Sequence, residues 1–303
     1  MAGESKTAVI AAIVGNLAIA VSKFAAAGFS GSAAMLSEAI HSLVDTGNDA
    51  LMLYGIRRSA KPPDDQHPFG YGHELYFWTL VVGVLIFAVG GGMSIVSGVL
   101  HIVNRKAAEA DVWNYAVLGV AAVFEAISWY FGLRAFRKEQ AGRGVIETIK
   151  VSKDPTTFSV LLEDSAALVG LALAFAGIYL SASLGMPWLD GASSIAIGVL
   201  LCAIALVMVY ESKGLLVGEG VTRATAQGIR ELIAVEPDVE SVGKLATMYL
   251  GPDEVMLAVE VHFRPERSGD DRRRSITRMT RAIQDKYPRI RHVFLDASWL
   301  GGA

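Results

Sequence analysis

The sequence is poor in the residues that build disulfides and thiolate metal clusters. Its 303 residues include one cysteine, Cys202, and six histidines. A single cysteine excludes an intrachain disulfide and a metal site made of several thiolates. Because Cys202 falls within an apolar run, we expect it to be a small buried apolar residue. Charged residues are also scarce, at 19%, and the sequence has no HExxH or GxSxG motif of a hydrolase.

What the sequence has in abundance is apolar residues, at 52%, with a mean hydropathy of +0.42. This composition is too apolar for an ordinary soluble globule and is typical of a membrane protein. Six apolar stretches have the length of about 20 residues that a helix needs to span a bilayer. They are residues 7–29, 33–54, 75–103, 112–136, 157–184 and 191–210. We therefore expect residues 1–211 to form a domain of six transmembrane helices.

The basic residues are distributed unevenly over the loops. They fall at the N-terminus, after the second, fourth and sixth stretches, and comprise Lys6, Arg57, Arg58, Lys61, Arg134, Arg137, Lys138, Arg143, Lys150, Lys153 and Lys213. The alternate loops hold only Arg105 and Lys106. The positive-inside rule then places both termini in the cytoplasm. The first apolar run is of spanning length and is followed by a second, which argues against a cleaved signal peptide. Short loops and no presequence favour a bacterial plasma membrane.

Residues 212–303 are charged and differ in character from the rest. We expect helices at 224–235 and 275–286, and strands at 241–250, 255–263 and 292–295, with a turn at 251–253. This order suggests a small α+β domain of the ferredoxin-like type on the cytoplasmic side. Its acidic and basic residues nearly balance, which argues against nucleic acid as a partner.

Ionisable residues occur inside the second apolar stretch, where they are expensive. His41, Asp45 and Asp49 follow each other at intervals of four residues, with Asn48 beside them. On an α-helix this spacing puts an imidazole and two carboxylates on one face, as a divalent cation site requires. Charges at membrane depth usually mark a pathway or a site. The alternative is that these side chains only pair with other helices of the bundle.

The fifth stretch contributes Glu163 and Asp164. Adjacent helical residues point about 100° apart, so we expect one of the two to bind metal and the other to do something else. Carboxylates from two helices together with an imidazole suit Zn²⁺ or a similar cation. Four other polar residues in the stretches could line a hydrated cavity or pair internally: Asn16, Lys23, Glu125 and Asp190. Lys23 could extend its ammonium to the membrane surface, and Asp190 could cap its own helix.

Two further groups could bind metal. The segment 62–74 holds Asp64, His67 and His73 among prolines and glycines, together with Asp65 and Glu74. It could be a second metal site, a funnel for cations, or a rigid turn between two helices. In the tail, His262, His292 and Asp296 could bind metal if the fold brings them together. The alternative is that they are ordinary strand residues with satisfied side chains.

Several of these features occur together in one family. The six stretches, the His41-xxx-Asp45 pair, the loop Asp64-x-x-His-Pro-Phe-Gly-Tyr-Gly72, the acidic residue of the fifth stretch and the α+β tail resemble the cation diffusion facilitators, transporters of zinc and related metals. The segments 37–48 and 161–165 are further similar to the zinc-transporter-nine-like branch. The resemblance implies metal binding between spans two and five, exchange of the cation for protons by a homodimer, and tails that dimerise and in many members sense metal.

The chain departs from the family pattern at two positions. Members commonly have His or Asp four residues before the aspartate of span five, whereas this sequence has Val160. The fourth ligand therefore stays open among Glu163, Asp49, Asn48 and water. In the loop, Tyr71 stands where many members have a histidine, and this weakens the second metal site.

The expected function is export of a divalent cation in exchange for protons by alternating access. The imidazole favours Zn²⁺, and the carboxylates leave Mn²⁺, Fe²⁺, Co²⁺ and Cd²⁺ open. Protons compete with the cation because the ligands must be deprotonated to bind it. No prosthetic group is expected. The alternatives are a membrane metal sensor or scaffold that transports nothing, and an intramembrane metalloenzyme.

Overall fold

The computed structural model describes residues 2–104, 112–140, 144, 148 and 152–296. The chain forms two compact units. One comprises residues 1–57 and 76–213, and the other residues 58–75 and 214–303. Four basic residues used for the membrane orientation lie outside the described residues: Arg105, Lys106, Arg143 and Lys150.

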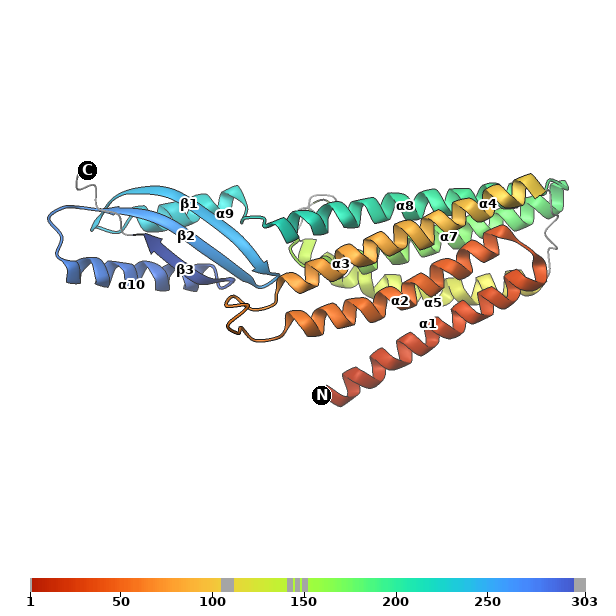
Figure 1. The fold of residues 1–303 in the computed structure, drawn as a ribbon, viewed down its shortest axis with the longest axis horizontal. Coiled ribbons are helices and arrows are strands. Elements are labelled where there is room, and N and C mark those ends of the chain that lie inside the picture. The colour runs from red at the N-terminus through yellow and green to blue at the C-terminus, as the bar shows by residue number, and fades with distance from the viewer. Residues whose placement is uncertain (1, 105–111, 141–143, 145–147, 149–151, 297–303) are drawn as a thin grey trace. The chain divides into compact units, whose positions relative to one another are not determined.

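The first unit is built of long helices (Figure 1). They are α1 (Ala2–Ser30), α2 (Ala33–Ser59), α3 (His73–Leu85), η1 (Ile86–Gly92), α4 (Met93–Asn104), α5 (Val112–Gln140), α7 (Pro155–Leu184) and α8 (Trp188–Val217). Each of the six expected apolar stretches falls within this helical structure. Among the described residues, four helical segments are long and apolar enough to cross a membrane: His73–Asn104, Val112–Arg134, Phe158–Leu184 and Trp188–Val217.

Helices α1 and α2 are not among these four segments, so the count of six spans stays a prediction. Helix α2 has 27 residues but carries Glu38, Asp45 and Asp49 in its first two thirds. The side chains of residues 1–15, which include half of α1, lie outside the described part of the chain. The coordinates therefore support four apolar spans by length and composition.

The third apolar stretch is not a uniform α-helix. Between α3 and α4 the seven residues of η1 form a π-helix that ends in three glycines. Wide π turns of this kind are rare and occur mostly as local interruptions of α-helices. Beyond η1, a Cβ atom on Gly98 would lie 2.5 Å from the carbonyl oxygen of Gly191, so α4 and α8 are in close backbone contact. Small residues permit such an approach between membrane helices.

Cys202 lies on α8 where this helix packs against η1. A Cβ atom on Gly91 would collide with its sulfur, and the Sγ atom is 3.9 Å from the carbonyl oxygen of Phe87. The thiol is free, and Cys202 is only partly buried. The expectation that Cys202 is a buried residue is therefore wrong.

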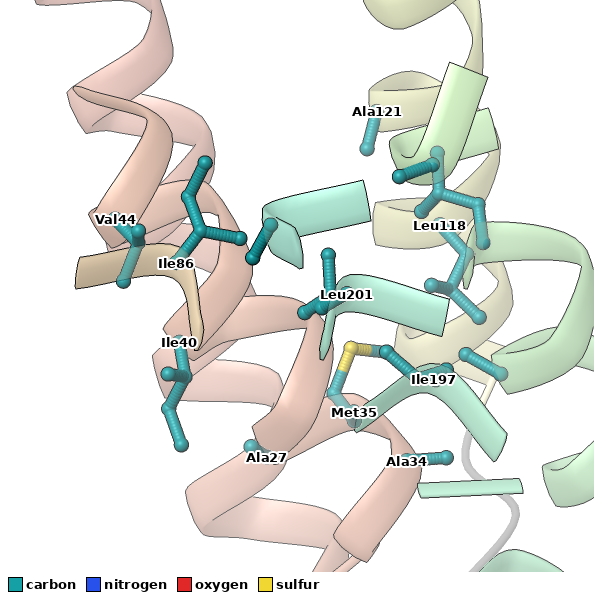
Figure 2. Packing of buried hydrophobic residues seen from close by; sticks show 14 of the residues in the cluster. Ala27, Ala34, Met35, Ile40, Val44, Ile86, Leu118, Ala121, Ile197 and Leu201 are labelled. Atoms are coloured by element: carbon teal, nitrogen blue, oxygen red, sulfur yellow. The ribbon is translucent and has the colours of Figure 1, made fainter. Parts of the chain in front are cut away.

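A large apolar core packs most of the helices of the first unit together, and a smaller cluster of Phe136, Phe158 and Leu161 joins α5 to α7. Buried residues from α1, α2, η1, α5, α7 and α8 contribute to the large core. Figure 2 shows Ile40 and Val44 of α2 gathered with Ile86 of η1 and with Ile197 and Leu201 of α8. This core fixes the rotation of α2 about its axis, and the rotation decides which polar side chains of α2 face the interior.

The second unit contains a small sheet with two helices. Its elements are α9 (Arg223–Ala234), β1 (Val239–Gly251), β2 (Glu254–Phe263), α10 (Gly269–Lys286) and β3 (Ile290–Asp296). The sheet has the order β1-β2-β3, with β1 antiparallel and β3 parallel to the central strand β2. The expected succession of helix, strand, strand, helix and strand is confirmed. The described sheet has three strands, one fewer than a complete ferredoxin-like sheet.

Alternate residues of β2 are buried, as expected for a strand with one covered face. The buried side packs against Ile229 and Ile233 of α9 and Met279 and Ile283 of α10. Helix α10 begins at Gly269, six residues before the expected start at Ser275. Its N-cap is Ser268, whose hydroxyl accepts a hydrogen bond from the amide of Asp271.

Candidate metal-binding site

Helix α2 turns its polar residues toward the interior of the first unit. His41 and Asn48 are almost completely buried, at 2% and 1% exposure. The imidazole Nδ1 of His41 lies 3.3 Å from the carboxylate Oδ1 of Asp45, one turn further along. His41 Nε2, Asp45 Oδ1 and both amide atoms of Asn48 are buried and have no hydrogen-bond partner among the described residues. Buried polar atoms are usually paired, so these atoms indicate that α2 faces water or an ion here.

Helix α7 brings the second group of carboxylates. It starts where Pro155 occupies the first turn and the side chain of Asp154 accepts a hydrogen bond from the amide of Thr156. Two turns later stand Glu163 and Asp164. Asp164 Oδ2 accepts a 2.8 Å hydrogen bond from the hydroxyl of Ser128 on α5. A hydroxyl group of α5 thus helps to orient a carboxylate of α7.

These carboxylates surround a cavity of about 80 Å³. It is lined by Asn16 and Ile19 of α1, Ser42, Asp45 and Asp49 of α2, Phe124, Glu125 and Ser128 of α5, and Val160, Glu163 and Asp164 of α7. A single water needs about 10–15 Å³, so there is room for several waters or a partly hydrated cation. Glu163 and Asp164 both line the cavity despite their different helical directions.

The cavity differs from the expected ligand set in two ways. His41 and Asn48 do not line it, although both are buried on the same helix as Asp45. Asn16, Glu125 and Ser128 do line it, although none of the three belongs to the expected ligand set; Asn16 and Glu125 were expected only to line a hydrated cavity or to pair internally. Within the described ranges no three His, Cys, Asp or Glu side chains stand close enough together to hold a metal ion. The ligand set therefore remains a prediction.

Asp49 already has a partner in the described conformation. Its Oδ2 accepts a 3.2 Å hydrogen bond from the side-chain amide of Asn16 on α1. The contact ties α1 to α2 at the edge of the cavity. Asp49 is thereby less free to bind a cation than Asp45, whose Oδ1 lies 3.3 Å from His41 Nδ1 but has no hydrogen-bond partner among the described residues.

Lys23 forms a buried ion pair next to this cluster. Its ammonium lies 3.0 Å from Glu38 Oε2 and donates a 2.7 Å hydrogen bond to the hydroxyl of Ser42. Lys23 and Glu38 are both completely buried, at 0% exposure. The expectation that Lys23 extends to the membrane surface is therefore wrong. Glu38 is the partner of Lys23, because a buried ammonium group needs an opposite charge close to it.

Asp190 caps a helix other than its own. Its carboxylate accepts hydrogen bonds of 2.6 Å from the hydroxyl of Ser32 and from the backbone amide of Ala33, the first residue of α2. The imidazole Nε2 of His101 on α4 lies 3.5 Å from the same carboxylate. The charge of Asp190 is thus placed at the N-terminus of α2, where the helix dipole favours an anion. The expectation that it caps α8 is corrected in this way.

The loop residues Asp64 and His67 form a compact turn. Asp64 Oδ1 accepts hydrogen bonds from the amides of Gln66 and His67, at 3.0 and 2.7 Å, and Oδ2 accepts one of 2.6 Å from the hydroxyl of Tyr71. The Tyr71 hydroxyl, followed by the His67 amide, holds the pKa of Asp64 below its usual range. The same contact raises the pKa of Tyr71. Of the three interpretations of the loop, the rigid turn is the one with contacts to support it. The loop metal site stays a prediction.

The loop also packs on the sheet of its own unit. The ring of Phe69 meets the rings of His292 and Phe294 edge to face, with centroids 5.5 and 6.3 Å apart. His73 Nε2 lies 2.9 Å from the carbonyl oxygen of Tyr249 on β1. His73 therefore points to the sheet, whereas His67 lies against Asp64 and Tyr71.

The tail candidates divide into two places on the sheet. His262 Nε2 lies 3.5 Å from Glu260 Oε1, and Asp296 stands opposite Glu260 in the β2–β3 pairing. His292 is opposite Met256, and its Nε2 lies 2.8 Å from Glu254 Oε1. The fold thus places Asp296 near His262 and His292 farther along the sheet. A tail metal site remains a prediction.

Comparison with known proteins decides the family. The sequence model described as Cation efflux transmembrane domain matches residues 9–217, well over half of the chain. The chain belongs to the cation efflux family. This is the family of the cation diffusion facilitators, as the sequence motifs indicated, and it comprises transporters, not enzymes.

Several curated relatives are similar over most of this chain. The proton-coupled zinc antiporter SLC30A9, mitochondrial, of Xenopus laevis is 32% identical over 265 residues, which are 87% of this chain and 47% of that protein. The metal tolerance protein C4 of Arabidopsis thaliana is 29% identical over 86% of this chain and 57% of its own length. The cation-efflux pump FieF of Cronobacter sakazakii is 24% identical over 86% of this chain and 81% of its own length. The chain therefore spans about half the length of the zinc antiporter.

A solved structure named MamM-CTD matches 25% of this chain and 94% of its own, at 22% identity and a TM-score of 0.24. The relatives at 32% identity are named as mitochondrial, so the similarity does not support a bacterial plasma membrane as the host. Membership of the family does support an integral membrane protein.

Proposed function

We propose that this protein exports divalent metal cations, Zn²⁺ foremost, from the cytoplasm in exchange for protons. The observation that carries the proposal is the cavity of about 80 Å³ into which α2 and α7 bring Asp45, Asp49, Glu163 and Asp164. Carboxylates at membrane depth are costly unless a cation or protons neutralise them. The relatives named as a proton-coupled zinc antiporter and as cation-efflux pumps support the same assignment.

The proposed ligands are His41, Asp45 and Asp164, with one further oxygen donor. Within the expected set the candidates for that donor are Glu163 and Asp49, which line the cavity, and Asn48, which is buried on α2 and does not line it. An imidazole with carboxylates favours Zn²⁺, and Mn²⁺, Fe²⁺, Co²⁺ and Cd²⁺ are secondary candidates. His41 does not line the cavity in the described conformation, so its binding to metal requires a different position of α2.

Exchange follows from competition for the same atoms. An imidazole or carboxylate must lose its proton to bind a cation, so protons arriving from the far side displace the metal. Alternating access would expose the cavity first to the cytoplasm and then to the far side. In this proposal six helices of residues 1–211 perform the transport, both termini are cytoplasmic, and residues 212–303 join two copies of the chain and regulate them. The loop 62–74 serves as a rigid turn.

The test is flux into proteoliposomes that contain a zinc-sensitive dye and a pH-sensitive dye. The wild-type protein is expected to admit Zn²⁺ and to release protons in the opposite direction, whereas Asp45→Asn should lose both signals. An exposed tail carboxylate changed in the same way, Asp253→Asn, is the matched control. Zinc binding without any flux in the wild type would indicate a sensor and would overturn the proposal.

A further inference from the structure

Helix α5 contributes a carboxylate to the cavity from a direction that α2 and α7 do not cover. Glu125 and Ser128 stand three positions apart in the sequence, so they lie on one face of α5. Both line the cavity, and Ser128 donates its hydrogen bond to Asp164 Oδ2. The same face of α5 therefore presents the Glu125 carboxyl group toward the candidate metal-binding atoms.

The side of α7 that could have supplied a donor is apolar. Val160 stands one turn before Asp164 and lines the cavity without a ligating atom. A Cβ atom on Gly132 of α5 would lie 3.7 Å from Val160 Cγ1 and 3.8 Å from Asp164 Oδ2, so α5 packs closely against this part of α7. Glu125 is the acidic residue of α5 that lines the cavity together with Val160.

The charge of the lining gives the second reason. Its five carboxyl groups belong to Asp45, Asp49, Glu125, Glu163 and Asp164, and the described lining contains no lysine or arginine. The Oδ1 atom of Asp45, which lines the cavity, is buried and has no hydrogen-bond partner among the described residues. A cation in the cavity would satisfy this arrangement, and each added carboxylate makes its surroundings richer in oxygen.

We propose that Glu125 is an oxygen donor to the transported cation and that it determines which metals the site accepts. This inference rests on the proposed transport function. Glu125 then supplies the ligating oxygen that the side chain of Val160 lacks. Because Mn²⁺ prefers carboxylate oxygen more strongly than Zn²⁺ does, removal of this oxygen should weaken Mn²⁺ more than Zn²⁺.

The experiment measures initial rates of Zn²⁺ and Mn²⁺ flux in proteoliposomes. Glu125→Gln keeps the shape of the side chain and is expected to raise KM for Mn²⁺ about tenfold and KM for Zn²⁺ by about threefold or less. The double variant Glu125→Gln with Val160→Asp returns a carboxylate from α7 and should recover most of the Mn²⁺ transport. The control Glu240→Gln changes an exposed tail glutamate and should leave both cations unaffected. Binding of each metal to the detergent-solubilised protein, measured by calorimetry, provides a second readout.

The outcomes separate this inference from the transport proposal. If the wild type moves neither cation, the transport function is wrong. If the wild type transports and Glu125→Gln keeps both KM values and the ratio of Mn²⁺ to Zn²⁺, the role of Glu125 is wrong. If Glu125→Gln fails to fold, Glu125→Asp decides: the inference requires a changed ratio of the two KM values, and an unchanged ratio contradicts it.

Discussion

The ammonium of Lys23 on α1 lies 3.0 Å from the carboxylate of Glu38 on α2, and both side chains are completely buried. Glu38 Oε1, the oxygen that does not meet Lys23, has no hydrogen-bond partner among the described residues. A buried ion pair whose partners are incompletely satisfied is not a strong source of stability. Removing one partner, however, leaves an isolated buried charge, and that is costly.

We expect Lys23→Met to destabilise the protein more than Lys23→Met combined with Glu38→Leu. Loss of one partner of a buried pair costs about 3–5 kcal/mol, whereas replacement of both by apolar groups is often nearly neutral. Thermal unfolding in detergent, followed by tryptophan fluorescence, measures the difference. Lys244→Met, which removes an exposed lysine of β1, is the control. Equal losses for the single and the double variant would contradict the interpretation of a mutually dependent pair.

Among the residues that cap the start of α2, Asp190 of α8 should be the one whose substitution lowers the stability most. Asp190→Ala leaves the amide of Ala33 and the hydroxyl of Ser32 without their acceptor, and hydrogen bonds to a charged group contribute about 1.5–3 kcal/mol each. Ser32→Ala removes one of these bonds and the 3.1 Å bond that the Ser32 hydroxyl accepts from the amide of Met35. It should still cost less, because the second bond joins two neutral groups. The same unfolding assay applies, with Asp253→Asn as the control, because its exposed pair with Arg289 contributes little. The capping role is wrong if Ser32→Ala costs more than Asp190→Ala.

The close contact between η1 and α8 can be tested with glycines. Gly91→Ala places a methyl group onto the sulfur of Cys202 and should destabilise the protein by about 1–3 kcal/mol. Gly119→Ala on α5 is matched to it, because no atom lies within 4 Å of the added Cβ. That variant should be neutral or more stable by about 0.5–1 kcal/mol, since alanine favours a helix. If the melting temperatures of the two variants agree, the contact is not as tight as described.

The loop should respond to acid through Asp64. The pKa of Asp64 is held below its usual range in the folded protein. The hydrogen bonds of its carboxylate therefore stabilise the loop at any pH above the usual pKa of an aspartate. This stabilisation is lost as the pH falls through the lower pKa of the folded state. Tyr71→Phe removes the first cause of the shift and should raise the pKa of Asp64. Carbon NMR of labelled aspartate during a pH titration measures it. Tyr287→Phe should have no effect, and an unchanged pKa in Tyr71→Phe would show that the hydroxyl is not the cause.

The sequence predicted the helices well because long apolar runs and charge breaks mark them directly. It did not predict η1, since apolar composition is the same in a π-helix and an α-helix. It also placed the start of α10 six residues late, because the polar run Asp270–Arg274 hid the helical periodicity. The sequence pattern of Ser268 and Asp271, a serine cap followed three residues later by an acid, could have shown the start.

The site was predicted only in part for a different reason. The spacing of His41 and Asp45 assigns them to one helix face, but it does not say how that helix is rotated in the bundle. Packing of Ile40 and Val44 decides the rotation, and in this rotation His41 does not line the cavity. Glu125 comes from a helix whose position depends on contacts far apart in the sequence. The packing of Phe69 on His292 is a long-range contact of the same kind.

The central claim is that the cation crosses through the cavity between α2 and α7, and not through the loop or the tail. The most direct measurement is Zn²⁺ flux in proteoliposomes for Asp164→Asn, compared with His67→Ala in the loop and His292→Ala in the tail at equal protein content. We predict that Asp164→Asn loses at least nine tenths of the initial rate, about a tenfold effect, while the other two variants keep a KM for Zn²⁺ close to that of the wild type. Transport that survives Asp164→Asn but fails in His67→Ala or His292→Ala would contradict the account.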